Sequence, residues 1–210
     1  MKKYIGAAAL ALAVGGTALA PAPALAGTAS EARAGTTSLA EVLAADGQKF
    51  DGRWSDFDIT EAAAYAVIGA KPDSPVALLA DGTTRLTAFL PTDRAFQALV
   101  KDLTGKKLGT EQKVFKAVAG LGIDTVEAVL LYHVVPGKTL TSGKVVAADG
   151  QKITTALAGA TFTVKVKGST VRLKDGDRND ANPQVVALDI NKGNRQVAHA
   201  INRVLRPMDL

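Results

Sequence analysis

The apolar residues of this chain recur at helical spacing in its first part and at every second position in its last part. Val126, Val129, Leu130 and His133 stand at i, i+3, i+4 and i+7, which places their side chains on one face of a helix. From residue 160 to residue 167, polar and apolar residues alternate as in a half-buried strand. Helices followed by a run of short strands favour the α+β class. We therefore predict N-terminal helices packed on a sheet rich in antiparallel pairs.

Local signals indicate where these helices and strands begin. The segments 38–41, 58–61 and 124–127 each have the form of a capping box, in which a first residue caps the helix and a glutamate three positions later reaches back. Gly168-Ser169 fits a two-residue hairpin turn. Strands joined by such short turns are expected to pair mostly in antiparallel fashion. The predicted strands are 85–90, 144–146, 152–155, 160–167, 170–173, 185–190 and 196–205.

The first residues have the pattern of a secretory signal peptide. Lys2 and Lys3 precede an uncharged apolar run, which is too short and too rich in glycine and alanine to be a comfortable membrane span. Small residues at alternate positions indicate cleavage after Ala26. We therefore expect a secreted, extracellular protein. The predicted parts are a signal peptide (1–26), a flexible leader (27–37) and a single domain (38–210).

Cysteine content and charge exclude several classes of protein. The chain contains no cysteine, so it has no disulfide framework and no thiol for a lipid anchor, and its fold must depend on its core. The formal charge of +5 falls when Lys2 and Lys3 leave with the signal peptide, and the basic residues are spread along the chain. This pattern does not predict a nucleic-acid surface. No further apolar run is long enough for a stable membrane span.

The two histidines, His133 and His199, are the best candidates for acid–base catalysis near neutral pH. Both lie in apolar segments, where a histidine is more often a hydrogen-bonded structural residue. No serine or cysteine nucleophile motif, His-Glu-x-x-His motif or phosphate-binding glycine loop accompanies them. The sequence favours a non-catalytic protein, with a secreted enzyme that uses His133 and His199 as the alternative.

Three further segments raise the question of a bound ligand. The loop 175–183 is acidic but does not fit a calcium-binding EF-hand, because Asp180 and Val186 stand where a glycine and a carboxylate are required. We interpret it as a polar loop between strands, with a looser calcium site as the alternative, and we expect no metal and no cofactor. The basic stretch 104–113 is interpreted as a solvated loop, with contact to acidic polysaccharide as the alternative. An apolar pocket beneath Trp54 would suit a carrier of a small apolar ligand, which is a third possible class.

Three segments, in this order, resemble the signatures of the fasciclin (FAS1) domain family. The segment 87–96 is similar to the first signature, a strand that ends in Pro-Thr-Asp and leads into a helix. Tyr132-His133 is similar to the central Tyr-His motif, and 197–205 is similar to the second signature, in which a histidine lies in an apolar strand. The resemblance covers nearly the whole chain after the leader. The matching fold-signature residues are Thr87, Phe89, Pro91, Thr92, Asp93, Phe96, His199, Ile201 and Asn202.

The resemblance implies a FAS1 fold, a β-wedge with helices packed on it, and a secreted module for adhesion or for binding matrix protein or polysaccharide. Family members on animal cells engage integrins through the Tyr-His region and through an acidic-Pro-Asp-Ile stretch. By this resemblance, the partner-binding candidates are Tyr132, His133, Asp189 and Ile190.

The chain departs from the family pattern at several positions. Ala187 and Leu188 stand in place of the acidic residue and the proline, and Asn202 replaces the usual aspartate. The alanine-rich composition and the signal-peptide pattern resemble those of bacterial exported proteins. We therefore expect a single-domain, secreted bacterial member of the family. Its expected partner is an extracellular protein or polysaccharide rather than an integrin.

Overall fold

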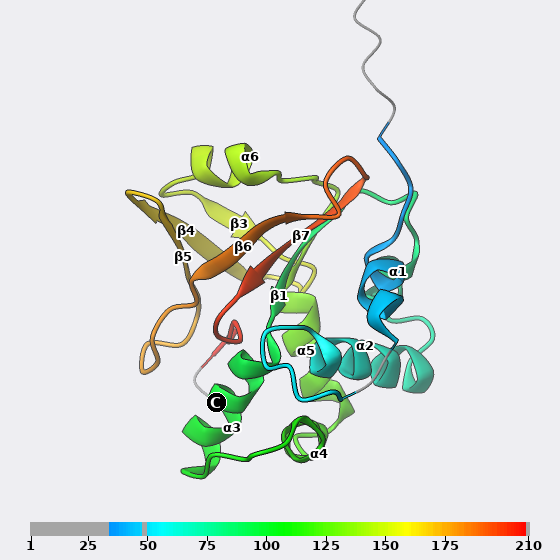
Figure 1. Cartoon of the computed structure of the whole chain (residues 1–210). Helices are drawn as coiled ribbons and strands as arrows, with labels where there is room; N and C mark the ends of the chain where they lie inside the picture. Colours follow the sequence, from blue (N-terminus) through cyan, green and yellow to red (C-terminus); the bar gives the residue numbers. More distant parts are fainter. Residues whose placement is uncertain (1–33, 48–49, 209–210) are drawn as a thin grey trace, which may run out of the picture. The chain divides into compact units, whose positions relative to one another are not determined.

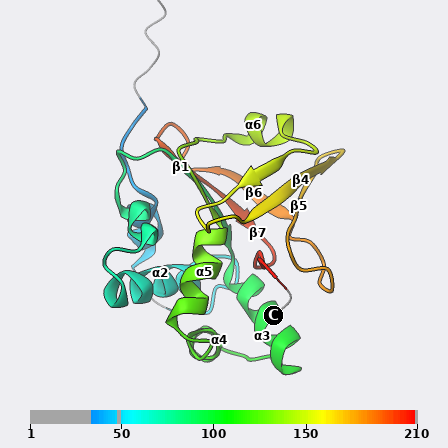
Figure 2. The ribbon, with the colours of Figure 1, turned by 180° about the vertical axis from the view of Figure 1, so that it is seen from behind.

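The computed structural model describes residues 34–47 and 50–208. The predicted signal peptide, 1–26, and the greater part of the predicted leader, 27–33, lie outside the described residues. The unit Ala34–Leu210 is shown from two sides in Figures 1 and 2. Within the described ranges, no helix is both long enough and apolar enough to cross a membrane.

The longer helices, α2 to α5, lie at one end of the sheets and the short helix α6 lies at the other, as both views show (Figures 1 and 2). The first helix begins at the predicted capping box. The Ser38 Oγ accepts a hydrogen bond from the Glu41 N–H at 3.1 Å, and the Glu41 carboxylate accepts one from the Ser38 N–H at 2.7 Å. In chain order the helices are α1 (Leu39–Leu43), η1 (Ala44–Asp46), α2 (Asp58–Ala70), η2 (Pro75–Ala80), α3 (Asp93–Thr104), α4 (Glu111–Ala119), α5 (Ile123–Tyr132) and α6 (Ser142–Ala147).

The main sheet of the described residues has the strand order β2-β1-β7-β6. Its central strands, β1 (Leu86–Pro91) and β7 (Gln196–Ile201), run parallel to each other. The edge strands, β2 (Val134–Pro136) and β6 (Val185–Ile190), are antiparallel to their neighbours. Every residue of β1 and β7 is buried, including the polar residues Thr87, Gln196 and His199, which explains why neither strand alternates between buried and exposed positions.

The second sheet has the order β3-β4-β5 and is antiparallel throughout. Along β4, Phe162 and Val164 are buried whereas Lys165 is exposed, as the alternation predicts. Helices followed by largely antiparallel sheets confirm the predicted α+β class, with the β1–β7 pair as the parallel exception. The strands of this sheet are β3 (Lys152–Thr154), β4 (Thr161–Lys167) and β5 (Thr170–Lys174).

Two apolar clusters hold the elements together, and β1 contributes to both. The larger cluster joins the helices to the main sheet and includes Ile59, Phe96 and Leu130. The smaller one lies between the two sheets, where the rings of Phe89 and Phe162 meet edge to face with centroids 5.2 Å apart. The two faces of β1 therefore tie the helical half of the chain to the strand half.

The predicted strand 144–146 is wrong, because these residues belong to helix α6. Val145 is 1% exposed and packs in the smaller cluster, whereas the next residue, Val146, is 46% exposed. A segment of three residues is too short to distinguish a strand from one turn of helix by its sequence. The burial of Val145 in the smaller apolar cluster favours the helix over the strand.

Two of the three predicted capping boxes are also wrong. In α2 the helix already includes the expected cap residue, and the Ile59 N–H donates instead to the Asp93 carboxylate at 2.9 Å. In α5 the N-cap is Gly122, and Glu127 forms an ion pair with Lys71. In α2 a distant aspartate accepts the hydrogen bond of the helix N–H, and in α5 the glutamate pairs with a distant lysine.

The last residues of the predicted leader are bonded to the domain. The Gly35 N–H donates to the Gly193 carbonyl at 2.8 Å, and the Arg195 N–H donates to the Gly35 carbonyl at 2.9 Å. The Thr37 N–H donates to Asn194 Oδ1 at 3.1 Å. Residues 35 and 37 of the predicted leader are therefore tied to the segment between β6 and β7.

Candidate functional site

Tyr132 and His133 lie where α5 ends and β2 begins. The Leu205 N–H donates to His133 Nε2 at 2.8 Å. His133 Nδ1 therefore carries the proton and donates to the Val129 carbonyl at 2.7 Å. The imidazole satisfies one of the carbonyls left free at the end of the helix, as its place on the helix face predicts, and joins α5 to the segment after β7.

Burial keeps His133 neutral. The side chain is 3% exposed, and this burial lowers its pKa to about 4, while the hydrogen bond to Val129 offsets part of the effect. At pH 7 the ring is uncharged and both nitrogens are engaged by backbone groups. Proton exchange with a substrate would require breaking one of these bonds, so the geometry favours a structural role.

Tyr132 is buried against the second sheet. Its side chain is 1% exposed, and its hydroxyl donates to the Thr161 carbonyl at 2.9 Å. Burial raises the pKa of Tyr132 to about 12. A partner cannot reach the side chains of Tyr132 and His133 in this conformation. Their role in partner binding stays a prediction, and any such role would act through the exposed residues around them.

His199 lies in the middle of β7 and, like His133, is buried, with 0% of its surface exposed. The Asp189 N–H donates to its Nδ1 at 3.2 Å, so Nε2 carries the proton and donates to the Leu140 carbonyl at 2.7 Å. Burial lowers the pKa of His199. Its ring packs against Phe89, with centroids 5.4 Å apart. His199 thereby joins β6 to the segment that follows β2.

Thr87 holds the same segment from β1. Its Oγ1 donates to the Lys138 carbonyl at 2.7 Å and accepts from the Leu140 N–H at 2.8 Å. The Thr139 Oγ1 donates to the Arg195 carbonyl at 2.6 Å. These bonds and those of His199 fix the connection between β2 and α6, so that α6 begins beside β6.

Asp189 lies at an irregular point of the edge strand β6. Its φ of 61° is uncommon for a residue other than glycine, and the pairing with β7 shifts register between Ala187 and Ile190. The carboxylate accepts hydrogen bonds from the Ser142 N–H and Oγ at 2.7 Å each, and from Lys192 Nζ at 2.9 Å. The irregularity therefore aims Asp189 at the first residue of α6.

The charge of Asp189 is used to brace α6 against β6. Burial disfavours the charged form, but the hydrogen bonds from Ser142 and Lys192 outweigh burial and lower the pKa of Asp189 to about 2. Ile190 is partly buried and packs against the larger apolar cluster. Direct contact of Asp189 and Ile190 with a partner stays a prediction. Sequence analysis did not identify Ser142 as the residue that Asp189 holds.

Exposed aliphatic side chains lie on the two elements that this brace joins. On β6, Val186 is 53% exposed and Leu188 is 45% exposed; on α6, Val146 is 46% exposed. β6 is an edge strand of the main sheet. Exposed apolar residues on an edge strand invite contact with another chain. We call Val146, Val186 and Leu188 the β6–α6 residues.

Two further fold-signature residues, Thr92 and Asn202, hold the C-terminal end of β7 to the end of β1 and to the start of β6. The Thr92 N–H donates to the Ile201 carbonyl at 3.1 Å, and Asn202 Oδ1 accepts from the Gln184 N–H at 2.8 Å. Asn202 thus makes this bond without the usual aspartate. The others are buried: Phe89, Pro91, Asp93 and Phe96.

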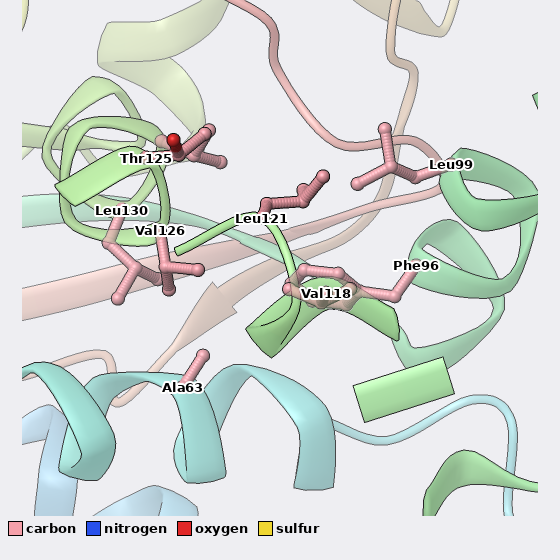
Figure 3. Close-up of a pocket in the computed structure, with 9 residues that line it drawn as sticks. Ala63, Phe96, Leu99, Val118, Leu121, Thr125, Val126 and Leu130 are labelled. Carbon is pink, nitrogen blue, oxygen red and sulfur yellow. The ribbon is translucent and has the colours of Figure 1, made fainter. Parts of the chain in front are cut away.

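Two pockets bear on the alternative of an apolar-ligand carrier. The first lies between α2, α3, α4 and α5 and is lined by apolar side chains such as Ala63 and Phe96 (Figure 3), but its volume of about 20 Å³ holds little more than one water. The second, beside Trp54, has a volume of about 290 Å³, but Asp51 and Glu111 are part of its lining. Neither pocket combines the size and the apolar lining that such a ligand needs.

The two charged loops noted in the sequence differ in structure. Lys106 and Lys107, in the basic stretch between α3 and α4, are exposed. In the acidic loop after β5, Asp177 and Asp180 form ion pairs with Arg206 at 3.0 and 3.4 Å. The acidic loop is thus bound to the segment after β7, whereas the basic stretch faces solvent.

The fold and the site define an α+β domain in which two buried histidines fasten helices and loops to a mixed sheet. The family model of the fasciclin domain matches residues 74–207. The chain therefore belongs to the fasciclin domain family, as its motifs predict.

The solved structures that are similar to this chain include one at low sequence identity. The chain is similar to a structure described as a novel fold revealed by a FAS1 domain pair from the insect cell adhesion molecule fasciclin I. The identity is 20% and the TM-score is 0.42, and the match covers 69% of this chain and 44% of that one. The chain thus spans less than half of that structure. No curated protein matches the chain.

Proposed function

We propose that the protein is a secreted, non-catalytic binding module of the adhesion type, which contacts an extracellular protein through the β6–α6 residues. Membership of the fasciclin family supports the adhesion role. The observation that carries the contact surface is the exposure of Val146, Val186 and Leu188 on the two elements braced by Asp189. Secretion and a bacterial origin rest on the pattern of the first residues.

The brace gives this surface a fixed shape before a partner arrives. Asp189, His199 and Thr87 hold α6, β6 and the segment between β2 and α6 by hydrogen bonds. A preorganised surface loses less conformational entropy when it binds. Exposed aliphatic side chains gain most from a partner that removes them from water, which suits a protein better than a hydrated polysaccharide.

The engagement of both histidines supports the non-catalytic part of the proposal. Each ring nitrogen of His133 and His199 is bonded to a backbone group. A polysaccharide partner remains the alternative and would be favoured at Lys106 and Lys107, because cationic side chains attract acidic sugars. Those lysines belong to the end of the domain where α3 and α4 lie, opposite to α6 (Figure 1).

The test is an array of extracellular-matrix proteins and glycans probed with the purified protein. We expect a protein partner to be retained, and the double variant Val186→Ser/Leu188→Ser to weaken its binding by about tenfold or more. The control Tyr65→Ser removes a side chain of similar exposure, 44%, from α2 and should leave binding unchanged.

Two outcomes would contradict the proposal. Retention of no matrix protein or glycan would remove the support for a binding module. Retention of a glycan that survives the double substitution but is lost in Lys106→Ala/Lys107→Ala would move the contact to the basic stretch and favour the polysaccharide alternative.

A further inference from the structure

A cluster of acidic side chains lies where the loop before α2 meets the first residues of three helices. Asp51 and Asp56 belong to the loop, and Asp58, Asp93 and Glu111 are the first residues of α2, α3 and α4. Carboxylate oxygens of Asp51, Asp56 and Glu111 lie within 4.8 Å of one another, as do those of Asp56, Asp58 and Asp93. Asp56 therefore joins both groups into a single cluster.

Two of these carboxylates are each held by one oxygen and present the other to the cluster. The Ile59 N–H donates to Asp93 Oδ1 at 2.9 Å, and the Gly52 N–H donates to Glu111 Oε2 at 2.9 Å. Asp93 Oδ2 and Glu111 Oε1 have no hydrogen-bond partner among the described residues, although Asp93 is 0% exposed and Glu111 2%. Both carboxylate oxygens of Asp56 are likewise buried without such a partner. Unbonded buried oxygens are rare and costly, and oxygens that converge in this way can bind a cation.

Positive side chains do not compensate the inner part of the cluster. Asp56, Asp58, Asp93 and Glu111 form no ion pair with any described residue. Within the cluster Asp51 pairs with the exposed Arg53, and elsewhere in the domain ion pairs hold acidic groups such as Glu127 and Asp177. The group must therefore either share protons or bind an external positive charge.

We propose that this cluster is a binding site for a calcium-type divalent cation, with Asp56 as the central ligand. Asp51 and Glu111 would bind the cation from the side of the pocket, and Asp58 and Asp93 would bind it from the side of helices α2 and α3. The proposal departs from the sequence-based expectation of no metal, which rested on the loop 175–183. It is independent of the partner contact proposed for β6 and α6.

The donor set and the spacing fit Ca²⁺. Calcium takes about 6–8 oxygen ligands at roughly 2.3–2.6 Å, and oxygens within 4.8 Å of one another fit on one such sphere. The groups contain only carboxylates, whereas zinc prefers histidine and cysteine. The pocket of about 290 Å³ that Asp51 and Glu111 line provides access and room for water ligands. Arg53, which pairs with Asp51 at 3.6 Å, is largely exposed and can move away from an incoming ion.

Calcium-dependent stability is the first test. Thermal melts of the purified protein at pH 7.5 are compared in CaCl₂, in MgCl₂ and in EDTA. A cation that binds only the folded state stabilises it by mass action, so we expect a saturable rise in Tm of about 5–10 °C at calcium concentrations about 100-fold above Kd. A melt that calcium does not change up to about 10 mM, above the range of weak extracellular sites, would overturn the proposal.

Carboxylate variants separate cation binding from proton sharing. Glu111→Gln and Asp56→Asn should abolish the rise in Tm that calcium produces, whereas Asp73→Asn, an exposed aspartate outside the cluster, should retain it. If the cluster instead shares protons, Asp56→Asn raises Tm at pH 7.5 and calcium has no effect on the wild type. That result would refute the cation site.

Terbium luminescence gives a test that needs no cluster variant to fold. Trp54 is the only tryptophan of the chain and lines the pocket with Asp51 and Glu111, so excitation of Trp54 should sensitise Tb³⁺ bound in the cluster. We expect Ca²⁺ to displace Tb³⁺ and quench this emission. Trp54→Phe should abolish the emission and leave the calcium-dependent rise in Tm. Absence of sensitised emission in the wild type would count against binding at this place.

Discussion

The two acidic regions of the molecule compensate their charge in opposite ways. In the loop after β5, Asp177 pairs with Arg206 at 3.0 Å and Asp180 pairs with Arg203 at 2.7 Å. Around Asp56, the buried carboxylates have no such pairs among the described residues. In sequence both regions are short, polar and rich in aspartate. The difference teaches that an acidic loop becomes structural or ligand-binding according to which distant segment folds against it.

The paired region fastens the segment after β7 to the rest of the domain. Arg206 also contacts Asp102 of α3 at 3.0 Å, and its backbone N–H donates to the Asp175 carboxylate at 2.9 Å. One buried guanidinium thus joins a helix, a loop and the chain beyond the central strand. The carboxylates of the paired region are thus engaged by arginines, whereas the buried carboxylates around Asp56 have no arginine or lysine partner among the described residues.

Arg206→Ala breaks the paired region and should have the largest effect. Arg206 is 6% exposed, so its removal takes away the buried guanidinium that pairs with the buried carboxylate of Asp177. We expect the free energy of unfolding to fall by about 3–5 kcal/mol. Urea unfolding followed by Trp54 fluorescence measures it. A loss below about 1 kcal/mol, typical of exposed pairs, would show that the region is not structural.

His133 adds a third case to the comparison of the two acidic regions, because it is a buried ionisable group whose hydrogen-bond partners are all backbone groups. Its folded pKa of about 4 lies below the unfolded value of 6.5, so its contribution is complete above pH 6.5 and is lost as the pH falls through 4. Because of His133 alone, the free energy of unfolding should fall by about 3 kcal/mol when the pH is lowered from 7 to 4.

The matching variant is His133→Ala, which should cost about 1–3 kcal/mol at pH 7, because it leaves the Leu205 N–H and the Val129 carbonyl without their bonds. Its deficit relative to the wild type should shrink or reverse by pH 4. Urea unfolding at both pH values measures the two differences. Equal stability of variant and wild type at pH 7 would contradict the structural role.

The cluster around Asp56 should respond to pH with the opposite sign in EDTA. The folded pKa of Asp93, about 9, lies above the unfolded value of 3.8, so stability is present at low pH and is lost as the pH rises toward 9. Between pH 6 and pH 8 we expect a loss of about 1–3 kcal/mol. Asp93→Asn keeps an oxygen that accepts from the Ile59 N–H but cannot ionise. The free energy of unfolding of this variant should therefore change less with pH than that of the wild type. A wild-type curve already flat in EDTA would contradict this account.

Arg203→Ala is the control within the paired region and should have the smallest effect. The Arg203 side chain is 31% exposed and contacts Asp102 at 3.2 Å and Asp180 at 2.7 Å. We expect the free energy of unfolding, measured by urea unfolding, to fall by about 0–1 kcal/mol, and by less in high salt. A loss as large as that of Arg206→Ala would mean that burial does not distinguish the two arginines.

Features set by neighbouring residues could be predicted from the sequence. The Ser38 cap, the alternation along β4 and the place of His133 on the inner face of α5 follow from periods and short motifs, and the structure confirms each. Features set by distant residues could not. The parallel pairing of β1 with β7, and the use of Asp93 to hold the Ile59 N–H of α2, depend on contacts that no local pattern contains.

The same limit applies to the candidate sites. The motif residues Tyr132, His133 and Asp189 could be found, but not that the first two are buried and that the third holds Ser142. The cluster around Asp56 was missed because its ligands come from three helix starts and a loop. An acidic residue in the first turn of a helix is usually explained by its favourable interaction with the helix dipole, and only the fold shows that three of them converge.

The central position of β7 has a consequence for the order in which the protein can be assembled. Leu86 pairs with Gln196 and Pro91 with Ile201, so the middle of the main sheet joins segments about a hundred residues apart. Until β7 has been synthesised, β1 and β6 have no common partner, and the helices have no finished surface to cover. Pairings this remote in sequence slow folding. A sheet that closes late suits a chain that crosses a membrane before it folds, which is the route that its first residues predict.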